Sequence, residues 1–152
     1  MVASGRRTKT PIWFWIASVA ALMWNAFGAF DYLMTRTRNV DYLSQMPGLT
    51  AQDILTYIDG LPIYAQFGWG LGVWGGLLGS LLLVTRSRFA VHAFAASLIG
   101  AAVSFGHQYL GGAQMPPAME QGAHKYMPLF IILVAIGLLL FARAMLKRGV
   151  LR

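Results

Sequence analysis

The chain of 152 residues contains no cysteine and few charged residues, and both absences narrow what it can be. Without cysteine it has no disulfide framework, no thiol redox relay and no cysteine-based metal site. Charged residues make up 11% of the chain and hydrophobic residues 57%, whereas roughly a quarter of a soluble domain is charged. The mean hydropathy of +0.58 points the same way. The composition therefore predicts a small integral membrane protein whose residues 1–152 form a single domain.

Four stretches are long and apolar enough to cross a bilayer, which takes roughly 20 mostly apolar residues in a helix. They run from about 12 to 34, 63 to 84, 89 to 110 and 126 to 146. We therefore expect an all-α fold, a bundle of four transmembrane helices.

The long connection between spans 1 and 2 contains a pattern of its own. Thr50-Ala51-Gln52-Asp53 resembles a capping box with aspartate in place of glutamate. Apolar residues follow at helical spacing, and Gly60 and Pro62 then end the pattern. This predicts a short amphipathic helix in the outer loop, which lies on the membrane surface or caps the bundle.

Acidic residues are scarce, and the few present lie on one side of the predicted topology. The other side holds nine of the twelve basic residues and no acidic one: Arg6, Arg7, Lys9, Arg86, Arg88, Arg143, Lys147, Arg148 and Arg152. By the positive-inside rule, this predicts that both termini lie in the cytoplasm. The net charge of +7 then reflects orientation and contact with anionic membrane lipids, and no nucleic acid partner is expected.

The second span carries small residues in strict register. Four of them recur at every fourth position and two form a parallel row: Gly68, Gly72, Gly76 and Ser80, then Gly75 and Gly79. Such rows let helix backbones approach closely, because lipid supplies no hydrophobic drive between helices. The tight connection at Arg86–Arg88 predicts an antiparallel hairpin with the third span, which has matching small residues. The partner of the glycine-rich face is either that third span or another protein copy.

Polar residues within spans are costly and are functional candidates by default. Asn25 and Tyr32 share one helical face, Asp31 lies beside it, and His107 ends the third span. In a functional interpretation, these four side chains line a pocket that opens to the periplasm.

A structural interpretation competes with that pocket. Asp31 comes one residue before the interface tyrosine Tyr32, so it fits head-group depth, where Arg36 or Arg38 could pair with it. Asn25 lies deeper and would form a hydrogen bond to another helix. The sequence leaves both interpretations open.

Metal binding has only weak candidates in this sequence. Imidazole and thioether groups suit Cu(I), and His107, Met115, Met119 and His124 gather near the outer end of span 3. Their spacing follows no specific pattern, and eight methionines in an apolar chain make coincidence easy. We therefore expect no metal site, and the sequence requires no cofactor. Because the standard catalytic motifs are also missing, we expect a protein that is not an enzyme.

Three segments carry a resemblance to known proteins. They are Trp24-Asn25-x-x-Gly28-x-x-Asp31-Tyr32-x-Met34-Thr35, then Gly72-Val73-Trp74-Gly75-Gly76-Leu77-Leu78-Gly79-Ser80, and Arg88-x-Ala90-Val91-x-Ala93-Phe94. With these segments the chain resembles small four-span inner-membrane proteins of proteobacteria, some of which are labelled "sugar transporter". The resemblance implies a multi-pass protein of the bacterial inner membrane but no established active site, so it assigns no functional residues.

Two functional hypotheses follow from the sequence. The first is a non-enzymatic accessory or structural subunit that associates with other membrane protein subunits, or with copies of itself, through the glycine-rich face. The alternative is a small-molecule binder or transporter that uses the periplasm-facing pocket.

Overall fold

The structure is a computed structural model that describes residues 10–110 and 115–152, so the basic residues Arg6, Arg7 and Lys9 lie outside the described part. Every regular element within it is helical. Four helices are long and apolar enough to span a membrane: α1 (Ile12–Arg36), α4 (Ile63–Val84), α5 (Ala90–Tyr109) and α6 (Met127–Lys147). Shorter elements connect them: α2 (Val40–Leu43), α3 (Ala51–Asp59) and the 3-10 helix η1 (Gly122–Tyr126). The predicted all-α bundle is confirmed.

The short helix α3 is also confirmed, including its predicted cap. The Thr50 hydroxyl accepts a hydrogen bond from the backbone N–H of Asp53, while the Asp53 carboxylate accepts one from the backbone N–H of Thr50. The Thr50 hydroxyl also donates a 2.6 Å hydrogen bond to the Asp53 carboxylate, and this bond, together with the one from the Thr50 backbone N–H, lowers the pKa of Asp53. The helix ends at Asp59, directly before Gly60. The preceding short helix α2 was not predicted.

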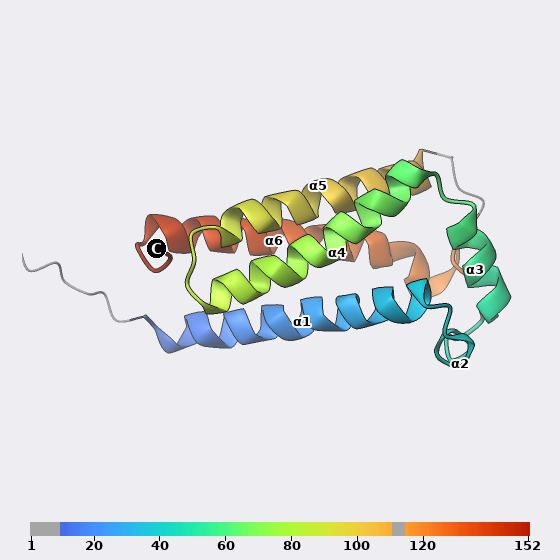
Figure 1. Cartoon of the computed structure of the whole chain (residues 1–152), viewed down its shortest axis with the longest axis horizontal. Coiled ribbons are helices and arrows are strands. Elements are labelled where there is room, and N and C mark those ends of the chain that lie inside the picture. Colours follow the sequence, from blue (N-terminus) through green and yellow to red (C-terminus); the bar gives the residue numbers. More distant parts are fainter. Residues whose placement is uncertain (1–9, 111–114) are drawn as a thin grey trace, which may run out of the picture.

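The helix α4 packs against α1 and α5, and α5 also packs against α6. The short helices α2 and α3 cover one end of the bundle (Figure 1). The start of α1, the α4–α5 turn and the end of α6 meet at the opposite end. The end with the turn carries these described basic residues: Arg86, Arg88, Arg143, Lys147, Arg148 and Arg152. The acidic residues lie toward the end covered by α2 and α3: Asp31, Asp41, Asp53, Asp59 and Glu120. The fold thus separates the charges as the sequence pattern does.

Glycine allows α4 and α5 to pack backbone against backbone. A Cβ atom built on Gly75 would lie 3.0 Å from the Ser97 nitrogen, and one built on Gly100 would lie 2.5 Å from the Gly72 nitrogen. The Ser97 hydroxyl also donates a 2.6 Å hydrogen bond to the Gly72 carbonyl oxygen. The small faces of the predicted hairpin therefore meet each other.

This packing identifies the partner of the glycine-rich face, which the sequence leaves open. Gly76 lies against the Asn25 side chain of α1, and Gly79 lies against the ring of Phe94 in α5. Gly68, Gly75, Gly76 and Gly79 are all buried. The face is occupied within the chain itself, so in this fold it is not free to bind another subunit.

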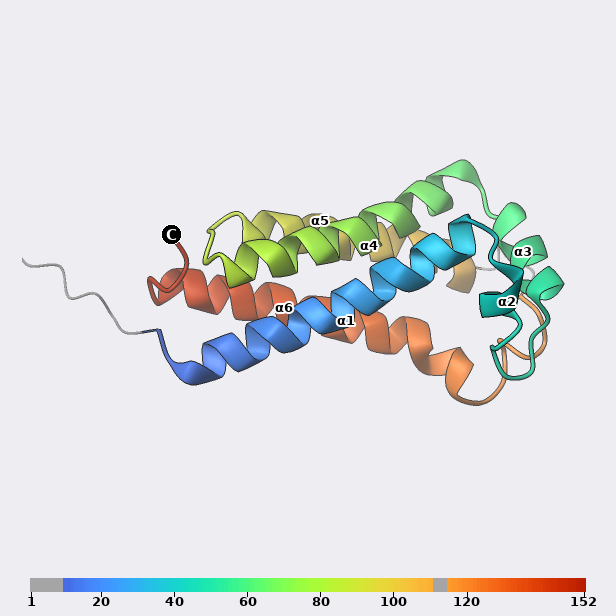
Figure 2. The ribbon, with the colours of Figure 1, turned by 60° about the horizontal axis from the view of Figure 1, so that its bottom comes forward.

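The helices α1 and α6 meet mainly through aromatic rings. Phe14 stacks on Phe141 with 6.1 Å between ring centroids, and Trp24 meets Phe130 edge-on at 5.5 Å. In Figure 2, α1 crosses in front of α6. This contact is looser than that between α4 and α5, because large side chains keep the two backbones apart.

The segment after α6 returns to the turn between α4 and α5. The Arg88 N–H donates to the Arg152 carbonyl oxygen at 2.7 Å, and the Arg152 N–H donates to the Arg86 carbonyl oxygen at 2.8 Å. Val150 and Leu151 are buried in the core beside the turn. These bonds fasten α6 to the α4–α5 hairpin.

Arg86 occupies a position that usually belongs to glycine. Its φ angle is +60°, in the left-handed region that follows the end of a helix. The Ser87 N–H donates back to the Leu82 carbonyl oxygen, which closes the terminal turn of α4. The Arg86 guanidinium donates from Nε to the Val150 carbonyl oxygen at 2.9 Å. The side chain thus offsets the backbone strain by holding the returning segment.

We expect Arg86→Ala to lower the free energy of unfolding by about 1–2 kcal/mol, because it loses a charge-assisted hydrogen bond and keeps the strained backbone. Arg86→Gly loses the same bond but relieves the strain, so it should recover about 1 kcal/mol of that loss. Equilibrium unfolding in detergent micelles measures both changes. Arg143→Ala, which removes an exposed arginine of α6, serves as the control for lost charge. Equal stability of the alanine and glycine variants would contradict this interpretation of the turn.

Candidate functional site

Asn25 joins α1 to α4 in the middle of the spans. Its Nδ2 donates to the Ala21 carbonyl oxygen and to the Ser80 hydroxyl oxygen, each at 2.9 Å. Ser80 is fully buried, and its own hydroxyl donates to the Gly76 carbonyl oxygen at 3.0 Å. The structure thus gives Asn25 the helix-to-helix hydrogen bond of the structural interpretation.

Asp31 holds α2 against the end of α1. Its Oδ1 atom accepts a 2.9 Å hydrogen bond from the Tyr42 hydroxyl group. Burial, together with the hydrogen bond and the negative charge of Asp31, raises the pKa of Tyr42 to about 12. Because this pKa is raised, the contact stabilises the fold fully below pH about 10 and is lost as the pH rises through about 12.

The two neighbouring arginines have other partners. Arg36 donates to Gln66 Oε1 at 2.9 Å, and Arg38 forms an ion pair with Asp59 at 2.6 Å. The possible pairing of Asp31 with one of these arginines is therefore not the arrangement that the structure has. Arg38, like Arg86, has a positive φ angle, of 55°, and its side chain ties α1 to the end of α3.

Tyr32 and His107 each contact α4, at different places. The Tyr32 ring meets the Trp69 ring edge-on, with 4.6 Å between centroids. His107 Nδ1 lies 2.7 Å from the Tyr64 hydroxyl oxygen. Asn25, Asp31, Tyr32 and His107 therefore each have their own partners, and the structure does not gather them around one pocket.

The four weak metal candidates also have separate surroundings. Met115 Sδ accepts a hydrogen bond from Gln108, Met119 packs against the apolar cluster beneath α3, and His124 is exposed. His107 is paired with Tyr64. Across residues 10–110 and 115–152, no three histidine, aspartate or glutamate side chains are grouped so that they could hold a metal ion.

The short helices form an apolar cap over one end of the bundle, which we call the helical cap. Its buried residues are Leu43, Leu49, Ile54 and Ile58, and Trp69 of α4 packs against them. This arrangement decides between the two positions predicted for the amphipathic helix: α3 covers the bundle.

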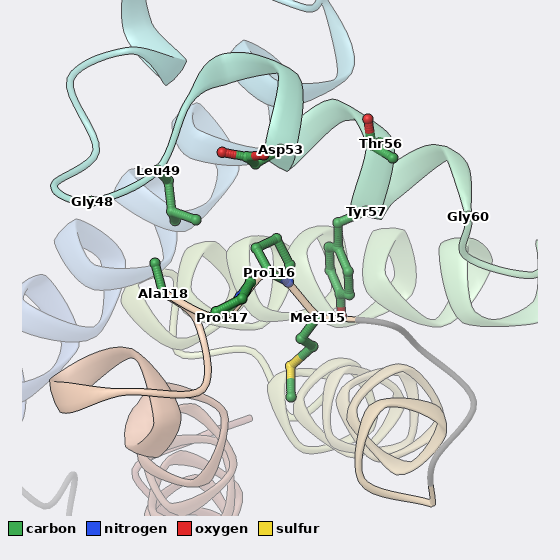
Figure 3. A pocket seen from close by; sticks show the side chains of 10 residues that line it. All are labelled: Gly48, Leu49, Asp53, Thr56, Tyr57, Gly60, Met115, Pro116, Pro117 and Ala118. Carbon is green, nitrogen blue, oxygen red and sulfur yellow. The ribbon is translucent and has the colours of Figure 1, made fainter.

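A groove of about 840 Å³ runs between α3 and the segment 115–118. Tyr57 extends from α3 toward Met115, and Pro116 and Pro117 form the facing wall (Figure 3). Partial burial raises the pKa of Tyr57. Asp53 also lines this groove, but its carboxylate already bonds Thr50 in the helix cap. The groove thus lies beside the helical cap, and Tyr57 is its one aromatic lining residue.

Sequence reasoning missed Tyr42 and Tyr64 as partners of the candidate residues. Tyr64 and His107 lie at similar distances along the chain from the α4–α5 turn at Arg86–Arg88. An antiparallel hairpin therefore brings them to the same level, and this register is a signal that would have paired them. For Tyr42 the sequence holds no such signal, because α2 is a single helical turn.

No family model matches the chain, and no curated protein or solved structure matches it either.

Proposed function

We propose that the protein is a non-enzymatic accessory or structural subunit of the bacterial inner membrane, with both termini in the cytoplasm, and that it associates with other membrane helices through α6. The observation that supports this most is a register of exposed residues along α6. The glycine-rich face of α4 is not the surface proposed for this association, because α5 and α1 cover it.

The exposed stripe of α6 has the spacing of a helix–helix seam. Its residues follow one another at intervals of four, three and four positions and are between 37 and 58% exposed: Leu129, Leu133, Ile136 and Leu140. Apolar residues at alternating intervals of three and four stay on one side of a helix that packs along another helix. Since lipid tails also cover apolar side chains, the support comes from this spacing and not from the exposure alone.

Gly137 lies beside this stripe, four residues after Leu133 and three before Leu140, and strengthens the proposal. Among the residues that the structure describes, no atom outside the local helix would lie within 4 Å of a Cβ atom built there. The glycine is therefore not needed for packing within the chain. Its absent side chain leaves room for the backbone of a second helix, as small residues do at other membrane interfaces.

We expect Gly137→Ile to abolish association while leaving the protein itself folded, because the new side chain blocks the approach of a second helix and its Cβ atom has no described neighbour within 4 Å outside the local helix. Gly28→Ile is the matched control, since a Cβ atom on Gly28 of α1 also has open space around it. Native mass spectrometry of protein released from its own membranes would measure the assembly. A wild-type protein that is strictly monomeric and brings no other protein with it would refute the proposal.

A further inference from the structure

The exposed stripe of α6 does not end with its apolar residues. Leu140 is followed, at intervals of three and four positions, by Arg143 and Lys147, and both of these side chains are exposed. With 3.6 residues in each helical turn, the six positions from Leu129 to Lys147 lie within an arc of about 80° on one side of the helix. The face that is apolar over most of its length therefore carries two positive charges at the end beside the α4–α5 turn.

Orientation in the membrane does not by itself require Arg143 and Lys147 to lie on this face. Basic residues at one end of a span set its orientation, but any side of the helix serves that purpose. Arg148, the next residue, lies about 100° around the helix from Lys147, and its guanidinium group is 5.9 Å from the centre of the Trp13 ring of α1. Arg148 thus has a partner in its own chain, whereas Arg143 and Lys147 continue the face that a second helix would cover.

Arg143 and Lys147 have no acidic partner within the described part of the chain. All five acidic residues lie toward the opposite end of the bundle, where the single ion pair among the described residues joins Arg38 to Asp59. A helix that covered the stripe would remove water from around Arg143 and Lys147. Charged groups that lose water are costly unless an opposite charge replaces it, so the covering helix has to supply acidic groups at this level.

A second copy of this chain does not supply them. Copies inserted in the same orientation and related by a two-fold axis along the membrane normal bring each stripe residue near its own counterpart. Two copies joined along α6 would therefore place four positive charges together, while the acidic residues of both copies lie at the other end of the bundle. Because like charges across an interface disfavour the pairing, the stripe selects against self-association.

We propose that the stripe binds a helix of a different membrane protein, one that carries aspartate or glutamate at the level of Arg143 and Lys147. This inference rests on the proposed function, because it names the partner of the same stripe. The apolar residues pack against the partner helix, while the ion pairs set the register of the two helices and exclude wrong partners. An acidic phospholipid also offers negative charge, but it gives no reason for the alternating spacing of three and four positions along the whole stripe.

Native mass spectrometry of the protein released from its own membranes tests the inference with three variants. Arg143→Glu/Lys147→Glu reverses both charges on the stripe, and Arg143→Lys/Lys147→Arg keeps them. Arg88→Glu/Arg152→Glu reverses two exposed charges at the same end of the bundle but off the stripe. We expect the wild-type complex to contain a protein other than this 16.7 kDa chain. Charge reversal on the stripe should lower the amount of this complex by about tenfold or more, and the other two variants should retain it.

A charge-reversed copy of the chain serves as a partner of known sequence. Wild type and Arg143→Glu/Lys147→Glu, with different affinity tags, are co-expressed in a heterologous bacterial host, so that opposite charges face each other across the stripe. We expect this mixed pair to co-purify about tenfold more than a pair of wild-type copies or a pair of reversed copies. Gly137→Ile in both members should remove the mixed pair, because it blocks the approach of the two helices.

The outcomes separate this inference from the proposed function. A wild-type complex made only of copies of this chain, or one that survives charge reversal on the stripe, overturns the acidic partner but leaves association through α6 intact. Equal loss in Arg88→Glu/Arg152→Glu, or a mixed pair no more abundant than the wild-type pair, also overturns it. A strictly monomeric wild type overturns both proposals. An acidic phospholipid that the wild type retains in place of any protein, and that charge reversal removes, identifies a lipid as the occupant and overturns the inference.

Discussion

Gly100→Ala should lower the free energy of unfolding by about 3 kcal/mol, although alanine is the better helix former by about 1 kcal/mol at an unconstrained position. A Cβ atom on Gly100 would lie 2.5 Å from the Gly72 nitrogen and 2.6 Å from the Gly68 carbonyl oxygen. Both neighbours are backbone atoms of α4, so no side chain rotation can make room. The two helices would have to move apart, and they would lose dispersion contacts along the whole hairpin.

Gly28→Ala is the matched control for this prediction. Gly28 also lies within a spanning helix, but a Cβ atom built on it has no neighbour within 4 Å. Its replacement should leave the stability unchanged or raise it by up to about 1 kcal/mol. Equilibrium unfolding in mixed micelles, followed by tryptophan fluorescence, measures both variants. If Gly100→Ala were as stable as Gly28→Ala, the close packing of α4 on α5 would be refuted.

The spanning helices could be predicted from sequence because their length and apolarity are local properties. The second span was predicted at 63–84 and is Ile63–Val84, and the third was predicted at 89–110 and is Ala90–Tyr109. The cap of α3 was also predictable, since Thr50 and Asp53 are three residues apart. In each case the information lies within one turn or one span of the chain.

Contacts between distant segments could not be predicted in this way. Arg86 and Val150 are 64 positions apart, and no sequence pattern around either residue predicts their hydrogen bond. The usual signal for a left-handed helix end is glycine, but Arg38 and Arg86 occupy such positions here. Each arginine is tied to another element by its side chain, so the reason for the exception lies outside the local sequence.

The candidate pocket illustrates a further limit of helical periodicity. A shared face on α1 predicts that Asn25 and Tyr32 point in similar directions, but it does not say what lies opposite them. The structure places Ser80 opposite Asn25, and Trp69 beside Tyr32. Likewise the glycine register predicted a close approach without identifying the partner, which in this fold is α5.

Phe94→Ala should lower the free energy of unfolding by about 3 kcal/mol, because the ring is 1% exposed and its removal leaves a cavity between α4 and α5. The ring lies directly over Gly79, where a Cβ atom would be only 2.7 Å from Phe94 Cδ1. Gly79→Ala alone should therefore cost about 1–3 kcal/mol through overpacking.

The double variant tests whether these two costs share one cause. In Gly79→Ala/Phe94→Ala the new methyl group occupies part of the space that the ring has left, so the clash disappears and the cavity shrinks. The double variant should thus be more stable than the sum of the single changes predicts, by about 1–2 kcal/mol. Unfolding of all four proteins in the same mixed micelles measures this coupling. Strictly additive losses of stability would mean that the Phe94 ring does not pack against Gly79. They would contradict the packing of α5 on α4 at this level of the bundle.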